Sequence, residues 1–174
     1  MLIALIGFMG SGKSTVGREL ARRLAYSLLD TDEVIETKAE MSIPEIFKKH
    51  GEKYFRQLEE EVLAEIIENN EDLVIATGGG IVLSEKNRRI LKEKTTTILL
   101  QAGVEELYNR LKNETNRPLL AVENPLAEIR RLLEEREEYY NTADFKVSTD
   151  GLQVEEIVEI ILKEVVSIEQ GECH

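Results

Sequence analysis

The chain is poor in the residues that most often build metal centres and covalent cross-links. It has one cysteine, Cys173, two histidines, His50 and His174, and no tryptophan among its 174 residues. A single cysteine cannot form an internal disulfide, which agrees with a reducing compartment, and we expect a cytoplasmic protein. So few Cys and His side chains give little support to a Cys/His metal site or a Cys–His nucleophile. A Mg²⁺ ion held by oxygen ligands is compatible with this composition.

Basic residues are also in the minority. The chain has 22 Lys and Arg against 34 Asp and Glu, which gives a formal net charge of −12 at pH 7. So acidic a surface repels nucleic acids and anionic lipids, and we expect neither as a partner. An anionic substrate would therefore need a local concentration of Arg and Lys. No apolar run approaches the length of a membrane span, and we expect residues 1–6 to begin the fold rather than to form a signal peptide.

The most informative motif lies near the N-terminus. Gly7–Ser14 fits G-x-x-x-x-G-K-[ST], the P-loop pattern. The apolar residues 1–6 before it predict a buried strand, and the apolar spacing over 15–24 predicts a helix after it. This order aims backbone N–H groups and a positive helix end at a polyphosphate, with Lys13 near the β- and γ-phosphates and the Ser14 hydroxyl on Mg²⁺. The alternative is a glycine-rich turn without a special purpose.

Strand-like and helical patterns alternate along the rest of the chain. Further strands are predicted over 26–29, 73–76, 97–100 and 145–148, and helices over 33–39, 44–50, 52–68, 84–93, 104–112, 125–140 and 154–166. This alternation predicts an α/β fold of the P-loop type, with three α/β/α layers around a five-stranded parallel sheet. We expect one domain over 1–166, with a polar loop at 113–124 and a tail at 167–174.

Two groups of residues follow predicted strand ends, where ligands bind in such folds. Asp30 and Asp32 follow the second strand. One carboxylate can join a magnesium shell while the other orients an attacking hydroxyl, or the pair can simply cap and begin a helix. Gly78, Gly79 and Gly80 follow the third strand. They indicate either a tight turn or a ligand that lies against the backbone, and the position favours the ligand.

Three arginines are candidates for anion binding. Arg56 lies early in a predicted helix, where it can instead pair with Glu59 and Glu60. Arg136 lies among four glutamates, which favours a solvated ion-pair surface when it is considered alone. Arg117 precedes a proline in the polar loop, where no helical partner is near, and it is a candidate for closing over a transferring phosphate.

Six motifs taken together form a far more specific pattern than the P-loop alone. They are Gly7–Ser14, Asp30-Thr31-Asp32-Glu33 with Ile35-Glu36, Phe55-Arg56 followed by Glu59, Gly78-Gly79-Gly80, Arg117-Pro118-Leu119-Leu120, and Arg136 with Tyr139. In order and spacing, the set resembles the shikimate kinase family, small P-loop kinases related to nucleoside monophosphate kinases. The resemblance extends from residue 7 to about residue 140.

The resemblance implies a Mg²⁺-dependent transfer of the ATP γ-phosphate to the 3-hydroxyl of shikimate, in the biosynthesis of chorismate and aromatic amino acids. It also implies a monomer with a lid loop at 113–124. The implied catalytic residues are Lys13, Asp32 and Arg117. The implied ATP site consists of Gly10, Ser11, Gly12, Lys13, Ser14, Thr15, Arg110, Arg117 and Gln153. The implied shikimate site consists of Asp32, Arg56, Gly78, Gly79, Gly80 and Arg136, with Glu59 fixing Arg56. Ser14 and Asp30 are the implied metal ligands.

Two other readings remain open at the level of the sequence. A small P-loop kinase for gluconate or a nucleoside monophosphate would share the P-loop, although the pair Asp30 and Asp32 suits a polyol better than a phosphorylated acceptor. A regulatory nucleotide-binding module without catalysis would be expected to lack the second aspartate or Arg117, and both are present.

Overall fold

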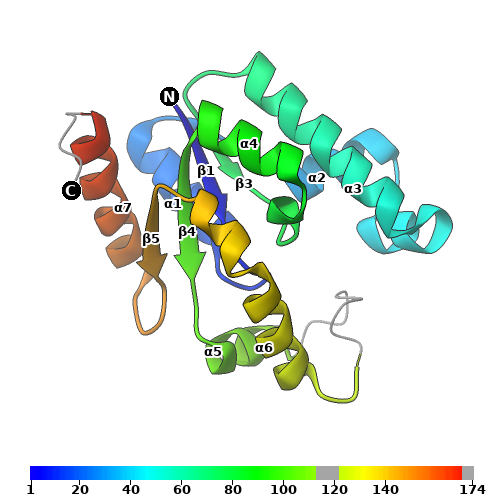
Figure 1. The fold of residues 1–174 in the computed structure, drawn as a ribbon. Coiled ribbons are helices and arrows are strands. Elements are labelled where there is room, and N and C mark those ends of the chain that lie inside the picture. Colours follow the sequence, from blue (N-terminus) through cyan, green and yellow to red (C-terminus); the bar gives the residue numbers. More distant parts are fainter. Residues whose placement is uncertain (113–121, 170–174) are drawn as a thin grey trace.

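The computed structural model describes residues 1–112 and 122–169, whose strands form a five-stranded parallel sheet (Figure 1). The strand order is β2-β3-β1-β4-β5, and all neighbouring strands are parallel. The strands are β1 (Leu2–Ile6), β2 (Ser27–Asp30), β3 (Leu73–Ala76), β4 (Thr96–Gln101) and β5 (Phe145–Ser148). The predicted parallel sheet is therefore confirmed.

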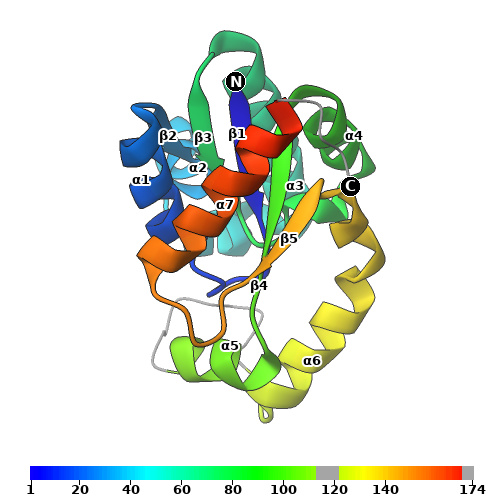
Figure 2. The same cartoon turned by 90° about the vertical axis from the view of Figure 1, so that its left-hand side faces the viewer.

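Helices cover both faces of this sheet, which confirms the three-layer α/β/α prediction (Figure 2). The α-helices are α1 (Lys13–Leu24), α2 (Thr31–Ala39), α3 (Ile43–Asn69), α4 (Glu85–Lys94), α5 (Val104–Leu111), α6 (Pro125–Arg136) and α7 (Val154–Glu169). In the part of the chain that the structure describes, the short 3-10 helices are η1 (Ile81–Leu83) and η3 (Glu138–Thr142). Within the described ranges, no helix is both long enough and apolar enough to cross a bilayer.

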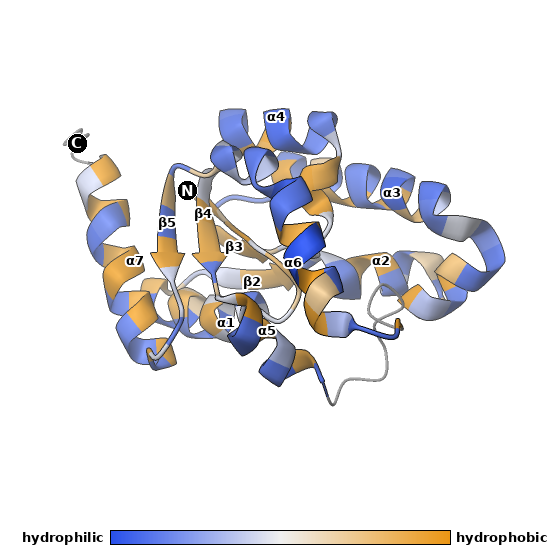
Figure 3. Ribbon diagram, turned by 60° about the horizontal axis from the view of Figure 1, so that its bottom comes forward, coloured by the Kyte–Doolittle hydropathy of each residue, from blue (hydrophilic) through white to orange (hydrophobic). Residues whose placement is uncertain are grey.

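The alternation of side chains along β1 explains the two apolar layers. Ile3 and Leu5 point to one face and pack with α1 and α7, whereas Ala4 and Ile6 point to the other and pack with α2, α3 and α4. All four residues are fully buried. Figure 3 shows the strands as mainly hydrophobic and the outer helix α4 as mainly hydrophilic, as expected for a sheet covered on both faces.

A third apolar cluster forms at the carboxyl end of the sheet. It joins Phe8 of the P-loop to Leu107 and Leu111 of α5 and to Ile129 and Leu132 of α6. Figure 1 shows α5 and α6 beyond the carboxyl ends of β4 and β5. These helices therefore pack beside the P-loop, at the edge of the sheet where ligands bind in this class of fold.

Two helix ends differ from the sequence-based expectation by three residues or more. The helix expected over 125–140 ends at Arg136, and the chain then tightens into η3, which places Tyr140 in the core. Helix α7 continues to Glu169 rather than ending at 166, although Val165 is its last residue in the apolar cluster. The polar loop predicted at 113–124 lies mostly outside the described residues, as do residues 170–174 of the predicted tail.

Gly51 separates two helical segments, as predicted, although both belong to the continuous element α3. Its φ of 82° and ψ of 172° are non-helical and are almost confined to glycine. The side chains on either side can therefore face the core at different angles. Ile46 before the break and Phe55 after it both belong to the same apolar cluster.

Gly51→Ala should lower the free energy of unfolding by about 1–3 kcal/mol, because a Cβ atom disfavours this backbone conformation. The added methyl group would meet no atom within 4 Å, so the loss would come from the backbone alone. Urea unfolding measures the change. Lys49→Ala, at an exposed position of the same helix, is the control and should change stability by less than about 0.5 kcal/mol. Equal stability of Gly51→Ala and the parent protein would contradict the conformational argument.

Candidate active site

The P-loop and the first turn of α1 line a cavity of about 440 Å³. Helix α1 begins at Lys13, directly after the glycine loop, so the N–H groups of its first turn have no helical acceptor and can receive an anion. Lys13 is buried, and its Nζ donates to the carbonyl oxygens of Gly7 and Phe8, both at 2.9 Å. Gly10, Ser11, Gly12, Ser14 and Thr15 also line the cavity. The residues of the predicted ATP-binding segment 10–15 therefore all line one cavity.

Asp30 has two partners that connect the P-loop to α2. Its Oδ2 accepts a hydrogen bond from the Ser14 hydroxyl at 2.6 Å, and its Oδ1 accepts one from the Asp32 amide at 3.0 Å. The second contact makes Asp30 the N-cap of α2. Capping was one of the two interpretations of this pair from the sequence. The contact with Ser14 shows that capping does not prevent Asp30 from also facing the cavity.

The oxygen atoms of Ser14 and Asp30 fit the chemistry of a hard divalent cation. Both residues line the cavity, and Mg²⁺ usually takes only one or two protein ligands together with phosphate oxygens and water. Among the described residues, no group of three or more His, Cys, Asp or Glu side chains is placed to hold a metal by itself.

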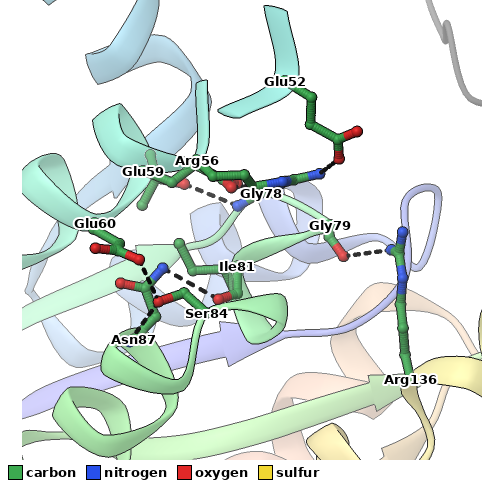
Figure 4. A network of polar contacts seen from close by, with 11 residues as sticks. Glu52, Arg56, Glu59, Glu60, Gly78, Gly79, Ile81, Ser84, Asn87 and Arg136 are labelled. Carbon is green, nitrogen blue, oxygen red and sulfur yellow. Dashed lines mark hydrogen bonds and ion pairs between the residues drawn. The ribbon is translucent and has the colours of Figure 1, made fainter. Parts of the chain in front are cut away.

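The three glycines after β3 allow charged side chains from two helices to approach the backbone closely (Figure 4). A Cβ atom on Gly78 would lie 2.5 Å from Asp32 Oδ1 and 3.0 Å from Glu59 Oε1, and one on Gly80 would collide with the Arg56 guanidinium. None of the three glycines has a positive φ, so close approach rather than an unusual backbone conformation requires them. Within the described residues, the amides of Gly79 and Gly80 donate no hydrogen bond, and Gly79 lines the cavity.

Arg56 and Glu59 form a partly buried ion pair beside the glycine turn, the segment Gly78–Gly80. Arg56 Nη1 donates to Glu59 Oε2, and Nη2 donates to Glu52 Oε1 at 3.1 Å. The Glu59 side chain is only 2% exposed. Burial raises the pKa of Glu59 to about 7, although the Arg56 guanidinium opposes the shift and Asp32 adds to it. The predicted pairing with Glu59 is present, whereas Glu60 instead accepts a hydrogen bond from Ser84.

Arg136 approaches the same glycine turn from α6. It is 3% exposed, and its Nη1 donates to the Gly79 carbonyl at 3.0 Å. Its guanidinium carbon also lies 5.4 Å from the centre of the Phe8 ring. The solvated ion-pair surface considered for Arg136 alone is therefore wrong. The last turn of α6 directs this arginine inward, away from the glutamates that flank it in the sequence.

The adenine side of the predicted ATP site is only partly as expected. Arg110 Nη1 donates to the Gly10 carbonyl at 3.2 Å, and Arg110 lines the cavity. Gln153 is exposed at the start of α7 and does not line it, whereas Leu152 and Thr149 do. The sequence had indicated the segment 151–153, which contains Leu152, but not Thr149, although Thr149 follows β5 and the strand-end rule indicates such a position. Arg117 lies outside the described residues.

Comparisons with known proteins agree with this geometry. The family model described as "Shikimate kinase" matches residues 9–166. A shikimate kinase from Thermodesulfovibrio yellowstonii is 46% identical over 97% of each chain. The crystal structure of shikimate kinase from Acinetobacter baumannii in complex with shikimate has a TM-score of 0.92 and 40% identity, covering 95% of this chain and 93% of that one. Deoxyadenosine kinase from M. mycoides with bound dCTP has a TM-score of 0.60 over 96% of this chain and all of its own, at 20% identity, and shares the fold alone.

Glu59→Gln should remove one component of the pH dependence of stability. Between its ordinary pKa of 4.5 and the folded value of about 7, Glu59 keeps a proton that it loses in the unfolded chain. The contribution of Glu59 to the free energy of unfolding therefore falls by roughly 3 kcal/mol as the pH rises through that window. Urea unfolding at pH 4.5 to 8 measures the difference between the parent and variant curves.

Glu68→Gln, at an exposed position of the same helix, is the matched control and should retain the parent pH profile. Parallel curves for Glu59→Gln and the parent protein would show that Glu59 titrates normally in the fold.

Proposed function

The chain belongs to the shikimate kinase family, and we propose that the cleft at the carboxyl end of its sheet carries out the family reaction with the residues assigned below. The reaction is transfer of the ATP γ-phosphate to the 3-hydroxyl of shikimate, giving ADP and shikimate 3-phosphate. One observation carries the assignment. Asp32 and Gly79 line the same cavity as Lys13, and Arg136 donates to the carbonyl oxygen of Gly79. Phosphate-binding and carboxylate-binding groups thus meet at one glycine turn.

On the nucleotide side, the N–H groups at the start of α1 hold the phosphate oxygens. Lys13 then neutralises charge on the transferring phosphoryl group, and Arg117, outside the described residues, does the same from the loop. Arg110 lies at the edge of the adenine pocket together with Thr149 and Leu152, and its Nη1 lies 3.5 Å from the Thr149 hydroxyl. Gln153 stays a prediction, and its exposed position favours a contact through the backbone.

An ATP-dependent kinase generally needs a divalent metal, and we assign Mg²⁺ to Ser14 and Asp30. When bound, the ion neutralises charge on the β- and γ-phosphates. The Ser14 hydroxyl provides one ligand, and the Asp30 carboxylate provides another directly or through water. Because Asp30 also caps α2, the same side chain fixes the start of the helix that carries Asp32.

On the acceptor side, Asp32 binds the substrate hydroxyls and orients the nucleophile. A carboxylate there can accept the hydrogen bond of the attacking 3-hydroxyl. Arg56 and Arg136 hold the shikimate carboxylate, for which the planar guanidinium fork is well suited. Gly78, Gly79 and Gly80 shape this pocket, and the amides of Gly79 and Gly80 donate to the substrate. Glu59 holds Arg56 in place.

We also propose that the enzyme works as a single-domain monomer in the cytoplasm, without nucleic acid or membrane partners. The net charge of −12 supports the absence of anionic partners. A coupled assay of ADP release with and without shikimate tests the activity, with gluconate and nucleoside monophosphates as competing acceptors. Release that does not depend on shikimate would contradict the proposal.

Arg136→Ala should weaken shikimate binding by about 2–4 kcal/mol and leave ATP binding nearly unchanged, because one charge-assisted pair to the carboxylate is lost. Arg56→Ala should act in the same direction, but it also leaves Glu59 without its buried partner. Arg136→Ala is therefore the cleaner test. Calorimetric titration of both ligands measures the effect.

Arg130→Ala is the matched control, because Arg130 is exposed on the same helix. It should bind shikimate as tightly as the parent protein. Unchanged shikimate affinity in both the Arg56 and Arg136 variants would remove these residues from the substrate site.

Asp30→Asn and Asp32→Asn should give different kinetic signatures. Asparagine is also a good N-cap, so Asp30→Asn should keep the helix while raising the Mg²⁺ concentration needed for activity. Asp32→Asn should lower kcat with little change in ATP binding, because the hydroxyl loses its charged acceptor. Steady-state kinetics at varied Mg²⁺ and varied shikimate separate the two effects. The same modest, metal-independent loss in both would mean that the pair only begins the helix.

A further inference from the structure

The backbone just after the glycine turn is bound by side chains from the first turns of α4. Asn87 Nδ2 donates to the Ile81 carbonyl at 3.2 Å. Arg88 Nη1 donates to the Val82 carbonyl at 2.6 Å and to the Leu83 carbonyl at 3.1 Å. All three carbonyl groups of η1 therefore have side-chain donors, which a 3-10 turn of this length cannot provide for itself.

Helix η1 in turn holds the glycine turn. The Ile81 amide donates to the Gly78 carbonyl at 3.1 Å, and the Leu83 amide donates to the Gly80 carbonyl at 3.0 Å. The carbonyl between them, that of Gly79, accepts from Arg136 at 3.0 Å. The position of the glycine backbone thus depends on η1 on one side and on Arg136 on the other.

Arg88 makes a second connection between the same two segments. Its guanidinium carbon lies 4.4 Å from the centre of the Tyr139 ring. Tyr139 belongs to η3, directly after the helix that ends at Arg136. One Arg88 side chain therefore holds η1 through two carbonyl groups and packs on η3 through its flat face, a combination that a lysine ammonium cannot reproduce.

We propose that Arg88 is a positioning residue for shikimate recognition, which sets the placement of Gly79 relative to Arg136 without touching the substrate. The inference rests on the proposed roles of Gly79 and Arg136 in binding shikimate. If the glycine turn or η3 shifts, the Gly79 amide and the Arg136 guanidinium no longer converge on one ligand. Of the residues in this linkage, Gly79 lines the cavity shared with the P-loop, whereas Arg88 and Tyr139 do not. A shift of the glycine turn should therefore affect shikimate binding more than ATP binding.

Arg88→Gln tests this linkage, with Arg89→Gln as the matched control on the same helix. Arg89 is exposed, and its side chain forms no hydrogen bond or ion pair with other described residues. Arg88→Gln should weaken shikimate binding about tenfold and change ATP affinity by less than twofold, whereas Arg89→Gln should change neither. Calorimetry and the KM values of both substrates measure the effect. Equal loss for both substrates, or unchanged shikimate affinity in a folded Arg88→Gln protein, would overturn the proposal.

Tyr139 provides a test that does not depend on the folding of Arg88→Gln. Tyr139→Leu removes the ring face and should weaken shikimate binding selectively, whereas Tyr139→Phe keeps the ring and should bind normally. Equal binding by the Leu and Phe variants would also overturn the proposal. Arg136→Ala, measured in the same experiments, distinguishes a failure of the shikimate-site assignment from a failure of the positioning role. Normal shikimate binding by Arg136→Ala contradicts the site assignment itself, whereas weak binding there with normal binding by the Arg88 and Tyr139 variants contradicts the positioning role alone.

Discussion

The arrangement of the cleft depends on the absence of side chains at Gly78 and Gly80. A single methyl group on Gly78 would occupy the space of the Asp32 and Glu59 carboxylates, and one on Gly80 would collide with Arg56. Because neither position carries a side chain, the charged groups of α2 and α3 can lie against the backbone that follows β3. The phosphate-binding site and the carboxylate-binding site can therefore lie next to each other. Phosphoryl transfer to a small acceptor that carries a carboxylate requires this proximity.

The acidic chain binds anions by local rather than overall charge. Its net charge is −12, yet Lys13, Arg56 and Arg136 lie in or beside the cleft, where backbone carbonyls or glutamate carboxylates hold them. Burial strengthens each interaction and also makes an unpaired charge costly. Each of these cations therefore has a hydrogen-bond acceptor. Lys13 and Arg136 donate to carbonyl oxygens, and Arg56 donates to the Glu59 carboxylate.

Prediction from the sequence succeeded where a local pattern has a direct physical meaning. The predicted ranges matched every strand to within one residue at each end. For the central strands β1, β3 and β4 the reason is that a strand buried on both faces is mainly apolar. The six motifs predicted the family, which the family model and the relatives confirm. Boundaries failed where packing decided them. Helix α6 ends at Arg136 because Tyr140 enters the core through η3, and helical spacing alone does not reveal that contact.

By itself, the sequence determined the sheet, the P-loop and the list of charged residues at strand ends, since these depend on periodicity and on residue type. Only the tertiary structure decided what each charge contacts. Arg136, surrounded by glutamates in the sequence, is buried against Gly79. Asp30 is at once a helix cap and a partner of Ser14. Arg88, which no motif singled out, lies between η1 and Tyr139. Partners such as Gly79 for Arg136 and Tyr139 for Arg88 lie far apart in the chain, and packing that no local pattern encodes brings them together.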